Sequence, residues 1–118
     1  MRYDLCLASN WEFDDGFIRL LDSACRARGR NLLTVTPATL ADILPLLSSG
    51  TAGFSALLDR ASETDHSYLP LVNIARSLGA RRFNPRELAD RAYDKAAIHH
   101  AFLEDGIPTP KTIILPAH

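Results

Sequence analysis

Lys95 has the most distinctive chemical setting in the sequence. It follows Asp94, which can cap a helix over residues 96–105, so its ammonium group would lie at the N-terminal end of that helix. A positive charge there is unfavourable for the helix alone and becomes favourable when an anion such as a phosphate binds beside it. The residue types therefore allow either a phosphate contact or an ordinary solvent-exposed lysine.

Further polar side chains follow the apolar runs of the chain. Asp59 and Arg60 could bind an anionic or amine-bearing substrate, or form a local ion pair that fixes their loop. Asn10 and Trp11 follow the first apolar run, and the single tryptophan could shape a pocket or pack against the end of a sheet. Asn84 could contact a ligand, although its position before a proline favours a helix cap.

The elements that must position these side chains alternate along the chain. Apolar runs at 3–9, 31–35 and 54–58 are typical of strands, and the short segment 81–84 is expected as a fourth strand. The amphipathic segments between them are typical of helices. This alternation predicts right-handed crossovers and a mainly parallel sheet with helices on both faces. We therefore expect a Rossmann-like three-layer α/β fold with about four strands in the order 2-1-3-4. The expected core contains Leu5, Leu7, Phe17, Leu21, Leu33, Val35, Leu57, Leu71, Ala75, Ile98 and Phe102.

The expected strand order also predicts where a ligand would bind. In open parallel sheets, ligands lie beyond the carboxyl ends of the strands at the point where the winding reverses. Here that point falls between the loops after the first and third strands. These loops carry Asn10 and Trp11 on one side and Asp59 and Arg60 on the other. Neither loop contains the glycine-rich pattern of a dinucleotide or P-loop site.

The stretch that contains Lys95 resembles a junction found in ATP-grasp ligases. The resemblance rests on Asp94, Lys95, Leu103, Gly106, Ile107, Pro108, Thr109, Pro110 and Thr112. In that superfamily the junction links an N-terminal, Rossmann-like pre-ATP-grasp domain to the nucleotide-binding subdomains. The preceding residues also look like such a domain, closest to the carboxylate-amine ligases of the glutamate-ligase-like branch.

The resemblance implies a function and a division of the chain. Residues 1–93 would form the pre-ATP-grasp domain, and residues 94–118 a linker helix, an elbow and a strand that lead to an ATP-grasp domain. The enzyme would activate a carboxylate as an acyl phosphate with ATP and Mg²⁺ and join it to an amine, and the lysine at the position of Lys95 would help to hold the nucleotide phosphates. The metal-binding carboxylates of the family would lie beyond His118, so we expect no catalytic residue, bound cofactor or activity in this chain by itself.

Composition excludes several other classes of protein. With 118 residues, 47% hydrophobic and 23% charged, the chain can bury a core without disulfides. A net charge of −1 predicts no general attraction to nucleic acid or to a membrane. No apolar run is long enough to span a bilayer and the first residues do not form a signal peptide, so we expect a cytoplasmic protein.

Cys6 and Cys25 are expected as buried thiols. The four histidines have no metal-ligand spacing, so no structural metal is predicted.

A second interpretation stays open beside the ligase. The chain could be a stand-alone Rossmann-like or receiver-like module that binds a protein partner or a small anion. The apolar, β-prone run Thr112–Leu115 would then be a docking edge through which the chain could also self-associate. A reading frame that continues past His118 with a second lysine and late acidic ligands favours the ligase, whereas a stop at His118 favours the binding module.

Overall fold

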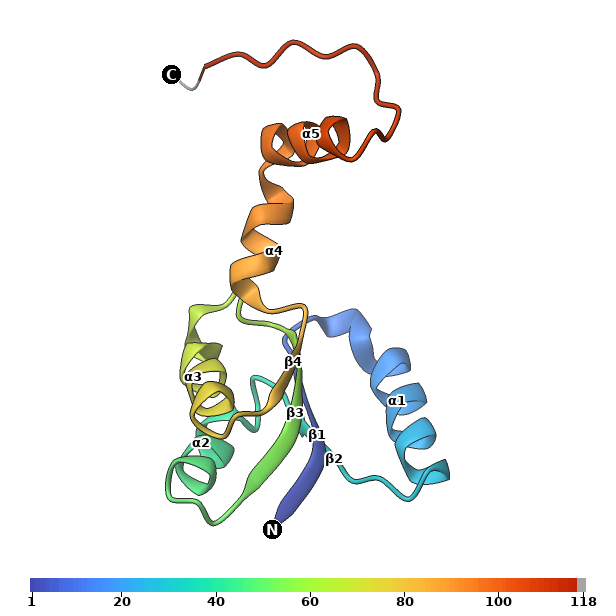
Figure 1. Cartoon of the computed structure of the whole chain (residues 1–118). Coiled ribbons are helices and arrows are strands. Elements are labelled where there is room, and N and C mark those ends of the chain that lie inside the picture. Colours follow the sequence, from blue (N-terminus) through green and yellow to red (C-terminus); the bar gives the residue numbers. More distant parts are fainter. Residues whose placement is uncertain (117–118) are drawn as a thin grey trace. The chain divides into compact units, whose positions relative to one another are not determined.

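Four strands form one parallel sheet in the order β2-β1-β3-β4 (Figure 1). The computed structural model describes residues 1–116. The strands are β1 (Arg2–Ser9), β2 (Leu32–Val35), β3 (Gly53–Arg60) and β4 (Arg81–Phe83), and all three pairings between them are parallel. The α/β class and the strand order predicted from the sequence are confirmed.

The central position of β1 follows from its composition. Cys6, Leu7 and Ala8 are each at most 1% exposed, so both faces of the strand are covered. Cys6 pairs in register with Leu33 of β2 and Leu57 of β3, which places these three side chains on one face of the sheet. Leu7 therefore points to the opposite face.

Helices connect the strands and cover the two faces of the sheet unequally. A 3-10 turn η1 (Glu12–Asp14) leads into α1 (Asp15–Ala27), which lies on one side of the sheet. Helices α2 (Leu40–Ser48) and α3 (Leu69–Ser77) lie on the other side, and α3 is preceded by a second 3-10 turn, η2 (His66–Tyr68) (Figure 1). One helix therefore covers one face and two helices cover the other.

The core lies mainly between the sheet and the pair α2 and α3. Its largest fully buried side chains include Tyr68, Phe54, Leu57 and Leu71. Among the core residues expected from the sequence, Leu7, Val35, Leu57, Leu71 and Ala75 are buried, and Leu5, Leu21, Leu33 and Ile98 are partly buried. The prediction is wrong for Phe17, which is 36% exposed, and for Phe102, which is 42% exposed. Phe17 faces the less covered side of the sheet, and Phe102 lies on α5 (Lys95–Glu104), which has no buried residue.

The last third of the chain forms a separate compact unit. The chain divides into Met1–Asn84 and Pro85–His118, and the second unit contains α4 (Arg86–Tyr93) and α5. Asp94 Oδ1 accepts a hydrogen bond from the Ala97 amide at 3.1 Å, so the predicted cap of α5 is confirmed. Gly106 ends the helix with a φ of 70°, a conformation that glycine adopts without a steric penalty.

The expected strand at Thr112–Leu115 is not formed. Residues 107–116 have no helix or strand, and Ile113 and Leu115 are 83% and 77% exposed. A β-prone sequence becomes a strand only when a neighbouring backbone accepts and donates its hydrogen bonds, and no strand of residues 1–116 pairs with this run. No helix in residues 1–116 combines the length and the apolar character needed to cross a membrane.

Candidate functional site

An aspartate, an arginine and a serine meet at the carboxyl edge of the sheet. Arg60, at the end of β3, donates from Nη2 to Asp14 Oδ1 at 2.8 Å and from Nε to Asp14 Oδ2 at 3.1 Å. The hydroxyl of Ser9, at the end of β1, donates to the same Oδ2 at 2.7 Å. The Asp14 side chain is 2% exposed and that of Arg60 is 39% exposed. This fork geometry joins the β1–α1 connection to the end of β3.

The electrostatics of this cluster fix its charge state. The hydrogen bonds from Arg60 hold the pKa of Asp14 below its usual range, although burial of the carboxyl acts in the opposite direction. The same bonds raise the pKa of Arg60. The guanidinium also lies 4.7 Å from the centre of the Phe17 ring. Arg60 is therefore first of all a structural residue, with one side open to solvent.

The local ion pair that the sequence allowed between Asp59 and Arg60 is not formed. Neighbouring residues of a strand point to opposite faces of the sheet, so the two side chains diverge. Asp59 instead accepts hydrogen bonds from the amides of Ala61 at 3.0 Å and Ser62 at 2.9 Å and from the Ser62 hydroxyl, which fixes the loop after β3. The partner of Arg60 is instead Asp14, the residue before α1, which makes no side-chain cap bond to that helix.

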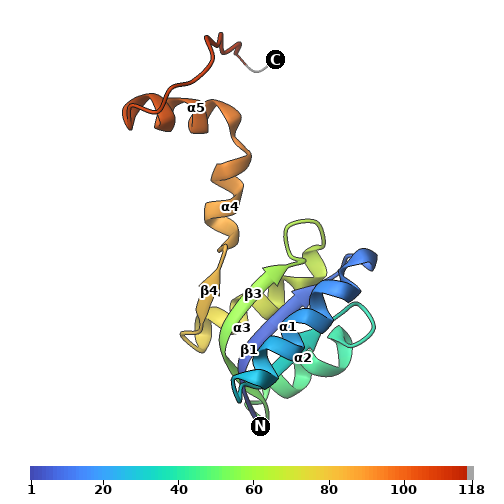
Figure 2. The same ribbon diagram turned by 90° about the vertical axis from the view of Figure 1, so that its right-hand side faces the viewer.

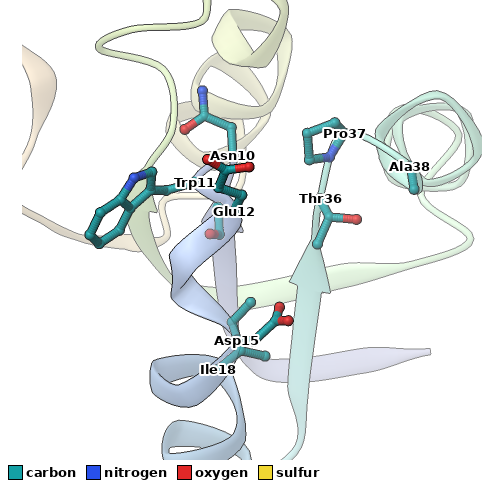
Figure 3. A pocket seen from close by; sticks show the side chains of 9 residues that line it. Asn10, Trp11, Glu12, Asp15, Ile18, Thr36, Pro37 and Ala38 are labelled. Carbon is teal, nitrogen blue, oxygen red and sulfur yellow. The ribbon is translucent and has the colours of Figure 1, made fainter.

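A cavity of about 410 Å³ opens between the ends of β1 and β2 (Figure 3). Asn10 and Trp11, expected at the site from the sequence, are among its lining residues, whereas Asp59, Arg60 and Asn84 are not. The cavity thus lies on the β2 side of β1, away from the expected position between β1 and β3. Its walls are formed by Ser9, Asn10, Trp11, Glu12, Asp15, Ile18, Thr36, Pro37 and Ala38.

The chemistry of the cavity wall favours a hydrogen-bond donor or a cation as ligand. Glu12 and Asp15 supply two carboxylates from one side and Thr36 a hydroxyl from the other (Figure 3). Asn10 donates to the Thr64 hydroxyl at 3.2 Å, which orients its amide. Sequence reasoning missed Glu12 and Asp15, because first-turn acidic residues are also what a helix N-terminus favours without any ligand.

Trp11 contributes to the rim of the cavity more than to its floor. The indole is 58% exposed and makes an edge-to-face contact with Phe13, with ring centres 5.4 Å apart. In Figure 3 its ring turns away from Thr36 and Pro37. Trp11 therefore lines the rim of the cavity and does not form its floor, so its part in shaping the pocket is smaller than the sequence allowed.

Tyr68 supports the end of β1 from the opposite face of the sheet. Its side chain is fully buried, and its hydroxyl donates to the carbonyl oxygen of Ser9 at 3.0 Å. Burial, with a smaller contribution from Asp65, raises the pKa of Tyr68 to about 12. A neutral phenol therefore anchors the loop that carries the cavity and the Asp14 cluster.

Asn84 and Lys95 belong to different units of the chain. Asn84 is exposed with a φ of 53°, a left-handed conformation that asparagine tolerates better than most residues, and Pro85 takes the N-cap position of α4 in its place. Lys95 is the exposed first residue of α5, beside the capping carboxylate of Asp94. The side chain of Lys95 is therefore accessible to an anion.

Candidate metal ligands and reactive thiols are sparse in the described part of the chain. Residues 1–116 contain no group of three His, Cys, Asp or Glu side chains that could hold a metal ion. Cys6 and Cys25 are free thiols. Burial raises the pKa of the Cys6 thiol to about 12.

No family model, curated protein or solved structure matches this chain.

Proposed function

We propose that the chain is the N-terminal, substrate-side domain of an ATP-dependent carboxylate-amine ligase of the ATP-grasp superfamily. The observation that carries this proposal is the junction from Asp94 to Thr112, whose residues resemble those of the family. Its local structure supports the comparison, because Asp94 caps α5, Gly106 terminates it, and the prolines that follow keep the chain out of a helix.

The first unit supports the proposal through its sheet and its cavity. A parallel Rossmann-like sheet presents small-molecule sites at the carboxyl ends of its strands, which is where the cavity lies. Glu12 and Asp15 suit the amine of a substrate, and Asn10 can add a hydrogen bond to a polar neighbour of that amine. Arg60 remains a candidate for the substrate carboxylate, because 39% of its side chain is exposed although Asp14 holds two of its N–H groups.

The residues of this chain fit only a small part of a nucleotide site. Lys95 is an exposed cation that can contact one phosphate, but the carboxylate of Asp94 already accepts a hydrogen bond from the Ala97 amide in the first turn of α5. One charge-assisted contact contributes about 1.5–3 kcal/mol, whereas micromolar affinity needs about 8 kcal/mol. ATP and Mg²⁺ would therefore be held mainly by residues of a longer parent protein, and this chain by itself is not expected to bind MgATP usefully.

A binding module is the second candidate, and one observation favours it. Part of one face of the sheet is apolar and not covered by any helix of residues 1–84, and exposed apolar surfaces often mark protein–protein contacts. The small-anion version of this candidate is disfavoured by the two carboxylates of the cavity. A protein partner fits the uncovered face better.

The reading frame that encodes the chain separates the two candidates. The ligase proposal expects codons beyond His118 for a second phosphate-binding lysine and for acidic metal ligands late in the product. A stop codon directly after His118 would leave the ligase without its metal site and would leave the binding module as the better account.

A further inference from the structure

The side of the sheet that carries α1 is only half covered. Leu7, Leu58 and Phe83 are neighbours across β1, β3 and β4, so their side chains point to the same face. Figure 2 views this face and shows α1 in front of β1, with β3 and β4 beside it and no helix of residues 1–84 across them. The helical layer on this face therefore covers β1 but does not extend over β3 and β4 in the first unit.

Large apolar side chains border the uncovered part of this face. Phe83 is 38% exposed and Leu58 is partly buried on the sheet. On α1, Phe17 and Leu20 are 36% and 69% exposed and lie three residues apart, which makes them neighbours on one side of the helix. The Arg60 contact with the Phe17 ring shows that this side of α1 faces β3. We call the surface formed by Phe17, Leu20, Leu58 and Phe83 the β3–β4 face.

Positive charge accompanies this apolar surface. The Arg81 guanidinium lies 5.0 Å from the centre of the Phe83 ring, and Arg81 is exposed. Arg81 pairs in register with Ala56, so it shares the face of Leu58 and Phe83. Arg60 adds a second guanidinium, whose charge is paired with Asp14 but whose side chain is 39% exposed. A partner suited to the β3–β4 face therefore presents apolar side chains together with a carboxylate near Arg81.

We propose that the β3–β4 face binds an acidic amphipathic helix of a partner protein. Helices complete a layer of an α/β sheet by packing an apolar stripe against it, as α1 does beside this face. The exposed groups are side chains on the sheet surface, so a helix fits better than a strand added to an edge. A second copy of this chain fits less well, because a two-fold contact through this face would set the arginines of one copy against those of the other.

The proposal is tested with a synthetic helical peptide. The probe carries leucines at spacings of three and four residues and glutamates beside that stripe, and its binding to the 118-residue chain is followed by fluorescence anisotropy. Phe83→Ser should weaken binding about tenfold, because a large apolar contact is lost. The matched control is Leu46→Ser, which removes a 47% exposed apolar side chain from α2 on the other side of the sheet and should leave the affinity unchanged.

Reversing the charge at position 81 tests whether binding depends on the acidic residues of the peptide or only on its apolar stripe. Arg81→Glu should weaken the glutamate peptide about tenfold and improve the binding of a matched peptide with lysines in place of glutamates. Equal urea midpoints for the variants and the wild type show that the fold is kept.

Three results would overturn the proposal. Acidic and basic peptides could bind the wild-type chain equally, Phe83→Ser and Leu46→Ser could have equal effects, or sedimentation could show a dimer that Phe83→Ser dissociates and that the peptide does not displace. The last result would assign the β3–β4 face to a second copy of the chain.

Discussion

Replacing Arg60 by alanine should destabilise the fold, because it removes the charge partner of Asp14. The Asp14 side chain is 2% exposed in the wild type, and the substitution leaves the Ser9 hydroxyl as its remaining side-chain donor. Removing one partner of a fully buried ion pair costs about 3–5 kcal/mol. Because 39% of Arg60 is exposed and water can reach its side of the pair, we expect a smaller loss of about 2–3 kcal/mol in the free energy of unfolding.

Replacing the other partner of the ion pair, Asp14, should destabilise the fold less. Asp14→Asn removes the buried charge and keeps an oxygen that can accept from Ser9, while Arg60 can turn its guanidinium toward solvent. We expect it to cost about 1 kcal/mol. The matched control for Arg60→Ala is Arg81→Ala. It also removes a guanidinium that lies over a phenyl ring, but within residues 1–116 Arg81 has no ion pair with a carboxylate. The control should lower the free energy of unfolding by less than about 1 kcal/mol.

The pH dependence separates the ion pair from general packing. In the wild type the pKa of Asp14 is lowered, so its contribution to stability is present above the unfolded pKa of about 3.9 and is lost as the pH falls through the folded pKa. In Arg60→Ala the largest contribution that lowers this pKa is lost, and only the hydrogen bond from Ser9 still opposes the burial that raises it. The deficit of the variant should therefore be largest at neutral pH and shrink as Asp14 takes up a proton.

Urea unfolding followed by far-UV circular dichroism measures these differences. The wild type, Arg60→Ala, Asp14→Asn and Arg81→Ala are compared at neutral pH and again near pH 4. A deficit for Arg60→Ala no larger than that for Arg81→Ala, or one that is constant across this range, would falsify the assignment of Arg60 as the charge partner of Asp14.

Three further predictions follow from single contacts. In the native protein, iodoacetamide should alkylate Cys25 well before Cys6, whose thiol is fully buried with a pKa raised to about 12, and equal rates would contradict this burial. Tyr68→Phe should cost about 1 kcal/mol in urea unfolding because the hydrogen bond to the Ser9 carbonyl is lost, and a neutral result would show that the bond contributes nothing. Asp94→Ala should speed hydrogen exchange in the first turn of α5 by removing a cap worth about 1 kcal/mol, and an unchanged exchange rate would show that the cap does not stabilise this turn.

The sheet could be predicted from the sequence because its signals are local. Apolar runs such as Leu5–Leu7 and Phe54–Leu58 mark the strands of the sheet, and the alternation with amphipathic helices limits the strand order. The cap at Asp94 and the stop at Gly106 were predictable for the same reason, since each depends on residues within one turn of the helix.

The candidate site could be predicted only in part, because its contacts join distant residues. Arg60 pairs with Asp14, 46 positions earlier, and nothing in the neighbourhood of either residue indicates the other. The position of the cavity beside β2 depends on how the loop at Thr36 packs. The prediction of a strand at Thr112–Leu115 was wrong for a similar reason. A β-prone sequence forms a strand only beside another strand that completes its backbone hydrogen bonds, and β-propensity does not indicate whether such a neighbour is present.

Calorimetric titration with MgATP tests the role given to Lys95 and, through it, the ligase proposal. In the protein encoded by the whole reading frame, Lys95→Ala should weaken nucleotide binding about ten- to a hundredfold and leave the urea midpoint unchanged, because one charge-assisted contact from an exposed first turn is removed. The 118-residue chain by itself should show no micromolar binding. An unchanged affinity in the Lys95→Ala variant, or micromolar binding of MgATP by the 118-residue chain, would contradict the proposal that Lys95 contributes one contact to a nucleotide site completed by other residues.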